Sequence, residues 1–327
     1  MVMGDNAVQR ILRKDAVHYV FDHKIPPMIT VELGESFIVE TEDALSGRIN
    51  SSEDLLTPEN LRPFSEYEPE IANPLCGPVY INGVEKGDVL VINIEEIIPA
   101  QKGVTGVKPN QGGLWDSKKW ASIHEKAYTH IIHHKPGPSH TMKDGIAIFN
   151  ERISWDLKPF IGTIGVAPQI EVETSAMGQG VWGGNWDCRD IAPGSRIYLN
   201  SFNKGGLLFI GDVHGSQGDG EWSGIANEIQ SEVRLHCEVI KNKKVPYARI
   251  EKEDSLISLN ADRPLEEAVN KAMTDLLEWI VDDYRMDPRE VYMLFSVNPN
   301  FRINVYQMVK AGKINYTVGA EFSKRFL

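Results

Sequence analysis

Residues that can carry chemistry concentrate in one stretch, residues 211–221, which reads GDVHGSQGDGE. Its eleven residues include four glycines, three carboxylates, one histidine and one amide. Asp, Glu and His bind metal ions and transfer protons, and glycines allow the tight turns in which such groups converge. The stretch therefore predicts a metal or proton-transfer site. A solvated glycine-rich loop is the alternative that the same composition allows.

Four side chains in and before this stretch predict a metal site. Asp212 and His214 stand two positions apart, so both point to one face if the preceding strand continues through them. Asp187 and Glu221 can complete the set, because a hydrolytic metal site needs about three protein ligands and one position open to water. The predicted metal ligands are therefore Asp187, Asp212, His214 and Glu221.

Further polar groups predict how the proton and the substrate are handled. Asp219 or Glu228 is a candidate general base, or a group that positions the attacking water. Asn185 and Gln217 offer amide donors to a substrate carbonyl, and the glycines leave backbone N–H groups free to stabilise an oxyanion. Together with the ligands, these groups predict a hydrolytic site.

Other reactive residues and motifs in the chain give weaker predictions of a catalytic or metal site. Cys188 could act as a nucleophile, but the carboxylate of Asp187 beside it would raise the pKa of the thiol. The chain contains no Gly-x-Ser-x-Gly elbow and no Gly-x-x-x-x-Gly-Lys-Ser/Thr phosphate loop. Five further histidines lack a standard ligand spacing, and the adjacent pair among them points to opposite faces of a strand. They are His124, His130, His133, His134 and His140.

The elements that must position these groups are mainly strands. A chain with 28 glycines and 18 prolines is rich in turns, which favours β structure. Apolar or alternating runs predict strands at residues 18–21, 28–31, 36–40, 89–94, 146–149, 160–168, 207–210 and 229–240. Two helices are expected late in the chain. The first covers residues 265–281 and starts at Pro264, and the second covers residues 291–295 and is capped by residues 287–290.

An internal repeat relates residues 77–88 to residues 184–195 at a constant offset without a gap. Gly77 lies over Gly184, and Gly87 lies over Gly194. Chance matches of glycine and apolar residues explain such a pattern equally well. If the repeat is real, it predicts two similar β units, with the chemistry retained mainly in the second.

Composition and charge exclude several classes of protein. The 327 residues carry a formal net charge of −12, which argues against nucleic-acid binding because phosphate groups need a basic face. No apolar run approaches the roughly 20 residues of a membrane span, and the polar start has no signal-peptide core. Three cysteines are too few for a disulfide framework. We therefore expect a cytoplasmic protein with reduced thiols that binds neither nucleic acid nor membranes.

Ordered motifs along nearly the whole chain resemble the acetamidase/formamidase family. They are PPMITV at 26–31, ETEDA at 40–44, GPVYINGVEKGD at 77–88, PFIGTIGVAP at 159–168, GGNWD at 183–187, the stretch 211–221, YMLFSV at 292–297 and FRI at 301–303.

The resemblance implies hydrolysis of a short aliphatic amide, of the formamide or acetamide type, to a carboxylate and ammonia. It also implies a mainly β fold of duplicated sandwich-like units with a smaller α+β part, and a homo-oligomer, either a dimer or a multiple of it. We expect a first β unit over residues 1–150, a second unit with the active-site loops over 151–260, and the α+β segment over 261–327. The expected cofactor is a divalent metal, zinc, with calcium as the alternative for a second, structural ion.

The family motifs also carry over a set of active-site positions. Among them we expect Asp43, Asp219 and Glu221 to be catalytic, beside the metal ligands above. The expected substrate contacts are Asn185, Gln217, Gly218, Gly220, Trp186 and Trp222.

The chain departs from the expected family pattern at two bulky residues. We expect smaller side chains than Trp186 and Trp222 at these positions, so these two, with Trp182, are expected to narrow the pocket. Two other functions stay open: a non-catalytic β-sandwich that binds a metal and a small ligand through the same loop, and a cysteine-dependent amidase that uses Cys188.

Overall fold

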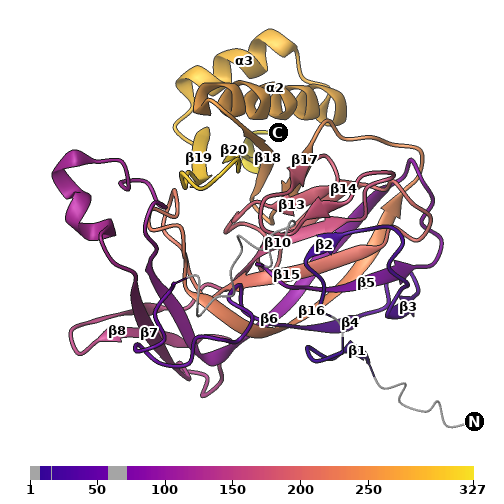
Figure 1. Ribbon diagram of the computed structural model, residues 1–327. Coiled ribbons are helices and arrows are strands. Elements are labelled where there is room, and N and C mark those ends of the chain that lie inside the picture. Colours follow the sequence, from indigo (N-terminus) through magenta and orange to yellow (C-terminus); the bar gives the residue numbers. More distant parts are fainter. Residues whose placement is uncertain (1–7, 16, 58–71) are drawn as a thin grey trace, which may run out of the picture.

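The computed structural model describes residues 8–15, 17–57 and 72–327, and strands dominate it (Figure 1). Strand residues make up 40% and helical residues 13%, which confirms the predicted mainly β class. The strands are β1 (Gln9–Ile11), β2 (Val20–Phe21), β3 (Ile29–Val31), β4 (Phe37–Thr41), β5 (Leu75–Ile81), β6 (Val89–Val107), β7 (Tyr128–Lys135), β8 (Ile146–Asn150), β9 (Ile153–Asp156), β10 (Phe160–Val166), β11 (Glu173–Thr174), β12 (Gln179–Gly180), β13 (Gly183–Asn185), β14 (Arg196–Asn200), β15 (Leu208–His214), β16 (Glu228–Ile240), β17 (Ala248–Glu251), β18 (Ser255–Asp262), β19 (Arg302–Gln307) and β20 (Tyr316–Ser323). The helices are α2 (Leu265–Tyr284), α3 (Pro288–Val297) and the 3₁₀ helices η1 (Lys118–His124) and η2 (Lys324–Phe326).

Within the described residues, eighteen strands are hydrogen-bonded into one curled sheet, and β2 pairs separately with β11. Neighbouring strands run antiparallel except for β1 with β4 and β3 with β5. The long strands β6 and β16 pair with each other along most of their length. Figure 1 shows them curving through the lower part of the molecule, opposite the helices.

The burial of the strands follows their residue pattern. Every residue of β10 is buried, as the nearly continuous apolar and glycine run at 160–168 predicts. β10 pairs with β13 on one side and with β15 on the other, so it occupies a central position in the sheet. In β16, alternate residues are buried, among them Val233, Leu235 and Cys237, which confirms the alternation expected there.

The internal repeat corresponds to a local two-fold relation between two turns and the strands that follow them. Strands β6 and β14 pair antiparallel at its centre. The N–H of Gly87 donates to the carbonyl of Ser201 (2.9 Å), and the equivalent N–H of Gly194 donates to the carbonyl of Ile94 (2.8 Å). Both glycines have left-handed backbones, with φ of 92° at Gly87 and 87° at Gly194. The matching hydrogen bonds show that the two turns are equivalent, and the two similar β units stay a prediction.

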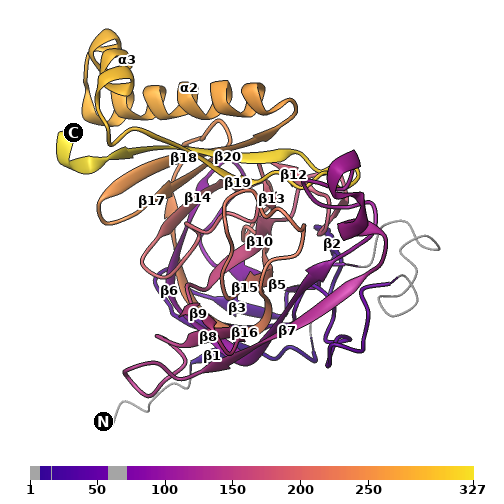
Figure 2. The ribbon, with the colours of Figure 1, turned by 90° about the vertical axis from the view of Figure 1, so that its left-hand side faces the viewer.

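One hydrophobic core joins the two predicted β units. Its buried side chains include Phe37 and Leu90 from the first unit and Ile164 and Phe209 from the second. A separate cluster lies beneath α2, where Leu276 and its neighbours pack against β18 and β20. Figure 2 shows α2 lying across these strands. The predicted unit boundaries at residues 150 and 260 stay a prediction.

Both predicted helices are present, and each continues slightly beyond its predicted end. α2 follows Pro264 and extends to Tyr284. At the start of α3, the side chain of Asp287 accepts a hydrogen bond from the N–H of Arg289 (2.9 Å), which caps the helix. In the described part of the chain, no helix is long and apolar enough to cross a membrane.

Candidate active site

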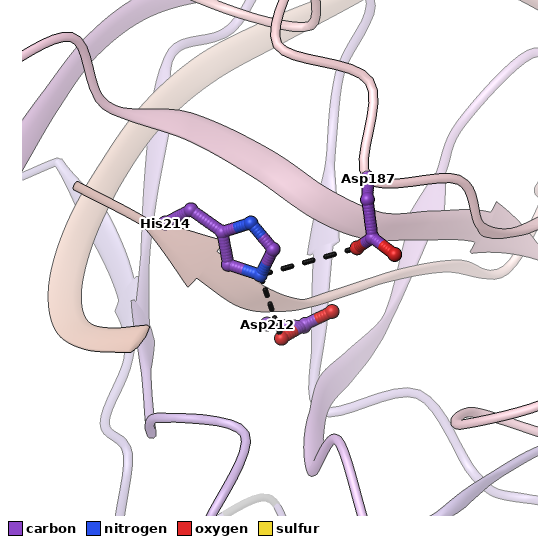
Figure 3. A group of neighbouring side chains, drawn as sticks. All are labelled: Asp187, Asp212 and His214. Atoms are coloured by element: carbon purple, nitrogen blue, oxygen red, sulfur yellow. Dashed lines mark hydrogen bonds and ion pairs between the residues drawn. The ribbon is translucent and has the colours of Figure 1, made fainter. Parts of the chain in front are cut away.

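Four adjacent strands bring the predicted metal ligands together. Across the sheet the order is β13, β10, β15 and β16. Asp187 follows β13, Asp212 and His214 lie in β15, and Glu228 begins β16 directly opposite His214. Because the strands are neighbours, side chains that are distant in the sequence meet at one place (Figure 3).

The ligand atoms converge on one imidazole nitrogen. Nε2 of His214 lies 3.2 Å from Oδ1 of Asp212 and 3.9 Å from Oδ1 of Asp187 (Figure 3). Oε2 of Glu228 lies 3.2 Å from the same nitrogen. Ligand atoms of Asp187, Asp212 and His214 all lie within 4.8 Å of one another, as do those of His214, Glu221 and Glu228. The structure therefore brings all four predicted ligands to one cluster, and each of them is buried.

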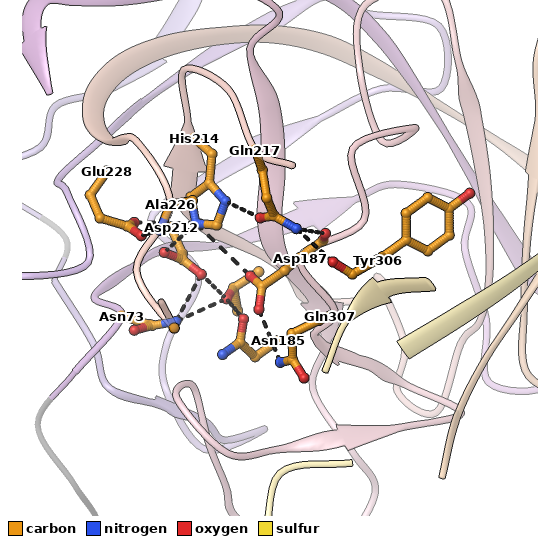
Figure 4. Close-up of polar contacts among 12 residues, drawn as sticks. Asn73, Asn185, Asp187, Asp212, His214, Gln217, Ala226, Glu228, Tyr306 and Gln307 are labelled. Carbon is orange, nitrogen blue, oxygen red and sulfur yellow. Dashed lines mark hydrogen bonds and ion pairs between the residues drawn. The ribbon is translucent and has the colours of Figure 1, made fainter. Parts of the chain in front are cut away.

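Neutral donors hold the outer oxygens of the two aspartates. Nε2 of Gln307 donates to Oδ2 of Asp187 (3.0 Å). Oγ1 of Thr163 (2.9 Å) and Nδ2 of Asn73 (2.8 Å) both donate to Oδ2 of Asp212. These contacts fix the orientation of both carboxylates and leave one oxygen of each directed at His214, as in metal sites whose ligands are held by outer hydrogen bonds (Figure 4).

Gln217 determines which nitrogen of His214 faces the carboxylates. Nε2 of Gln217 donates to the carbonyls of Asp187 and Tyr306, at 2.8 Å each, so its Oε1 must be the atom that lies 2.9 Å from Nδ1 of His214. Nδ1 therefore carries the donated proton. Nε2 is left to face Asp212, which is the arrangement needed for an imidazole metal ligand (Figure 4).

The backbone at the cluster adopts a conformation that non-glycine residues rarely populate. Asp187, Asp212 and Glu221 have φ of 48°, 52° and 47°, and Asn73 has φ of 52°. Each such residue costs about 1–3 kcal/mol, and such residues gather at functional sites. Four of them around one imidazole indicate that the fold is organised to position these side chains.

Gly162 allows the two aspartates to approach each other across β10. A Cβ atom at this position would lie 2.6 Å from the carbonyl oxygen of Asp212 and 2.9 Å from side-chain oxygens of Asp187 and Asp212. The carbonyl of Gly162 also accepts hydrogen bonds from the N–H groups of Trp186 (3.0 Å) and Asp187 (3.1 Å). A glycine is therefore required at this point of the strand for the cluster to close.

Burial and mutual repulsion shift the pKa values of the acids. Burial, together with the charge of Asp212, raises the pKa of Asp187 to about 7. Burial also raises the pKa values of Glu221 and Glu228. Burial alone would lower the pKa of His214, but the charges of Glu228 and Asp212 outweigh it and hold that pKa well above its usual value.

The donor set fits a divalent cation. Four carboxylates surround one imidazole, and a buried excess of negative charge is strongly unfavourable unless a cation compensates it. Apart from its 3.2 Å approach to Nε2 of His214, the buried Oε2 of Glu228 has no hydrogen-bond partner among the described residues, so it is an oxygen that a cation would satisfy. The cluster could therefore hold a metal ion.

A cavity of about 410 Å³ opens onto the cluster and gives a small molecule access to it. Its remaining lining is largely apolar. Eight polar residues that belong to the cluster or lie close to it line this cavity: Asn73, Asn185, Asp187, Asp212, His214, Glu221, Glu228 and Gln307.

Comparison with known proteins identifies the family. The model of the Acetamidase/Formamidase family matches residues 5–179 and 177–314. The chain belongs to this family. The matched residues include every member of the cluster around His214.

Individual proteins similar to this chain support the family assignment. The acetamidase of Mycolicibacterium smegmatis is 28% identical over 289 residues, which cover 72% of this chain and 69% of that protein. The formamidase of Methylophilus methylotrophus is 26% identical over 248 residues, which cover 63% of this chain and 59% of that protein. The crystal structure of acetamidase from Yersinia enterocolitica superposes with a TM-score of 0.84 at 33% identity, covering 98% of this chain and 93% of that one. The chain is therefore an amidohydrolase that acts on linear amide C–N bonds.

The structure does not bring every predicted catalytic acid to the cluster. The side chain of Asp219 is 63% exposed, forms an ion pair with Arg189, and lines a second cavity with Gly218 and Trp222. Asp43 is buried, and its Oδ1 accepts hydrogen bonds from the N–H groups of Leu45 (2.8 Å) and Gly47 (3.0 Å). Burial raises the pKa of Asp43 to about 6, but the side chain is used to shape the loop that carries Ala44 and Leu45 to the main cavity.

Of the predicted substrate contacts, Asn185 lines the main cavity and the others do not. Oδ1 of Asn185 lies 3.1 Å from the Thr163 hydroxyl, whose proton is donated to Asp212, and Nδ2 donates to the carbonyl of Ala176 (2.9 Å). The amide of Gln217 is used entirely within the protein, as described above. The N–H of Gly220 donates to the carbonyls of Val305 (2.8 Å) and Tyr306 (3.1 Å), so it is not free to stabilise an oxyanion.

The three tryptophans expected to narrow the pocket lie elsewhere. None of the described residues that line the main cavity is a tryptophan. Trp186 is fully buried in the core, Trp182 packs against Phe21 with ring centroids 4.7 Å apart, and Trp222 is half exposed beside the second cavity. The main cavity is therefore wider than the sequence suggests.

Cys188 has the properties of a core residue. It is fully buried, and burial raises the pKa of its thiol well above the usual value. It does not line either of the two cavities beside the cluster among the described residues. Tyr306 and Arg189 act to lower the pKa of this thiol, but burial outweighs them, so the thiol is not activated as a nucleophile.

Sequence reasoning missed the neutral residues that support the cluster. Thr163, Asn73 and Gln307 hold the outer oxygens of the aspartates, yet all three are neutral residues far in the sequence from the stretch 211–221. Only Thr163 had a detectable signal, as the one polar residue in the buried strand β10.

Replacement of Gln217 by Leu is expected to lower metal affinity by about 10- to 100-fold, because His214 loses the acceptor that fixes its tautomer. A competition titration with a metal-binding dye measures this affinity. Gln9→Leu makes the same change at a glutamine that contacts Thr30 and Glu35, and it should leave affinity unchanged. Equal affinity in both variants would contradict the assigned role of Gln217.

Proposed function

We propose that the enzyme hydrolyses primary carboxamides to a carboxylate and ammonia with the help of a divalent metal held by Asp187, Asp212 and His214. The observation that carries the proposal is the convergence of Oδ1 of both aspartates on Nε2 of His214, with every other polar atom of these three side chains already engaged. Glu228 offers a further oxygen beside them. The relatives named acetamidase and formamidase support acetamide and formamide as reference substrates.

Zinc is the proposed ion. An imidazole nitrogen combined with carboxylate oxygens suits zinc, whereas calcium and magnesium prefer oxygen ligands alone. When bound, such an ion polarises the amide carbonyl and lowers the pKa of water so that it attacks near neutral pH. Among the described residues, both groups of acids and histidines that could hold an ion include His214, so calcium as a second, structural ion stays a prediction.

Glu221 is the proposed general base. It is buried, it lines the cavity, and its carboxylate lies in one group of potential ligand atoms with the imidazole of His214 and the carboxylate of Glu228. No hydrogen bond from another described residue engages this carboxylate, unlike those of the two aspartates. Glu221 takes a proton from the attacking water as the C–O bond forms, and the proton passes to the nitrogen as the C–N bond breaks.

Gln307 is the proposed contact for the substrate amide group. Its Nε2 is engaged by Asp187, but among the described residues its buried Oε1 has no hydrogen-bond partner. Because Gln307 lines the cavity, this oxygen is available to accept an N–H from a primary carboxamide. The N–H₂ group would then be held beside the cluster, where the leaving nitrogen must be protonated.

Ammonia release from acetamide, measured before and after treatment with a chelator, tests the proposal. Activity is expected to fall to the background of the His214→Ala variant and to return when zinc is added back. Turnover that a chelator leaves unchanged, in protein shown to be free of metal, would contradict the metal mechanism. The homo-oligomer and the cytoplasmic location stay predictions.

A further inference from the structure

The cavity above the cluster is much larger than the smallest amides. Its volume is about 410 Å³, which lies in the range of roughly 300–1,000 Å³ typical of pockets for drug-sized ligands. Acetamide has four non-hydrogen atoms and fills on the order of 100 Å³, if each takes about the share of one water molecule. Most of the cavity would therefore stay empty of substrate if acetamide were the preferred amide.

One wall of the unfilled part is apolar and firmly packed. Leu45, Leu56 and Ile225 line the cavity, and all three are buried members of a hydrophobic cluster that also contains Val104. Since they are held by their neighbours, these side chains form a preformed surface rather than a loose one. They offer no hydrogen bonds to a polar substituent.

A second group of apolar side chains, from a different part of the chain, lines the cavity as well, and the polar residues Lys108, Asn110 and Gln111 also contribute to its lining. Met177 precedes β12, and Val309 and Ile314 lie between β19 and β20. Val309 and Ile314 are buried, whereas Met177 is partly exposed. A methionine adapts its shape to different apolar groups, so this wall tolerates both alkyl chains and rings.

We infer that the preferred substrates are primary amides with an apolar acyl group larger than acetyl, such as an alkyl chain of three or more carbons or an aryl ring. This inference rests on the proposed amide hydrolysis. The carboxamide lies against the acidic cluster and Gln307, and the apolar group fills the space between the two walls. Binding of the apolar group at a distance from the reacting carbon holds the carboxamide in place for attack.

A series of amides tests the inference through the rate of ammonia release. From acetamide to butyramide and hexanamide, kcat/KM is expected to rise by about fourfold for each buried methylene, and phenylacetamide is expected to exceed acetamide by about 100-fold or more. A kcat/KM that falls steadily from acetamide to butyramide and phenylacetamide would overturn the inference while the amidase function stands. If no amide in the series is cleaved above the His214→Ala background, the proposed function fails, and the inference fails with it.

A change in the wall gives a second, independent test. Met177→Trp adds bulk to the lining and is expected to lower the ratio of kcat/KM for phenylacetamide to that for acetamide by about tenfold. Met293→Trp makes the same change on the exposed face of α3, where the side chain is 59% exposed, and should leave the ratio unchanged. A ratio that Met177→Trp leaves unaltered would contradict the placement of the acyl group against this wall.

Discussion

Replacement of His214 by Ala is expected to lower kcat/KM for acetamide by at least about 10³-fold, which corresponds to about 4 kcal/mol of lost transition-state stabilisation. The side chain is fully buried and contributes the one nitrogen on which the carboxylates converge. Its removal leaves four buried acids without the imidazole, so the cluster loses both its nitrogen ligand and its charge balance. Steady-state measurement of ammonia release determines the effect.

His133→Ala provides the matched control for this variant, because His133 is exposed on β7 and takes no part in the cluster. Circular dichroism and thermal unfolding of both variants establish that the fold is retained. Activity of His214→Ala within about tenfold of the parent enzyme would contradict the central role of this residue. A comparable loss in His133→Ala would show that the assay reports on something other than the cluster.

Replacement of Glu221 by Gln is expected to lower kcat by about 10²- to 10⁴-fold while the metal content stays unchanged. The substitution keeps the size of the side chain but removes the carboxylate that is to accept a proton from water. The residue lines the cavity and, within the described residues, no hydrogen-bonding partner engages its carboxylate, so the effect arises at the reacting groups. Turnover and metal analysis of the same preparation measure the two quantities.

Asp219→Asn makes the corresponding change at the other acid predicted to be catalytic. The side chain of Asp219 is exposed, paired with Arg189 and absent from the lining of the main cavity, so a much smaller loss of kcat is expected than for Glu221→Gln. The reverse order of effects would assign the proton transfer to Asp219. A loss of metal in Glu221→Gln would instead assign Glu221 to the ligands.

The cluster of acids around His214 was predictable because its chemistry is visible in the residue types. Asp212 and His214 stand two apart in a strand, and Asp187 lies in a glycine-rich segment, so acids, imidazole and turns coincide in the sequence. The buried strand β10 was also predictable from its apolar and glycine run. What the sequence lacks is the order of strands across the sheet, which places β10 between β13 and β15.

The roles of individual acids depend on this order. Asp219 and Glu221 lie two residues apart in the same loop and both line the second cavity, yet Asp219 is exposed whereas Glu221 is buried and also lines the main cavity. The tryptophans illustrate the same difficulty, because Trp186 stands between two site residues and nevertheless points into the core. Neutral partners such as Thr163 and Gln307 become visible only when distant strands are brought together.

Metal analysis of purified protein tests the central claim most directly. The parent enzyme is expected to contain about one divalent ion per chain, and Asp187→Asn, Asp212→Asn and His214→Ala are each expected to have lost it. The His133→Ala control should retain the ion. A parent enzyme that hydrolyses amides at full rate without any bound metal, or variants that keep the ion at the level of the parent, would contradict the claim that these three side chains hold it.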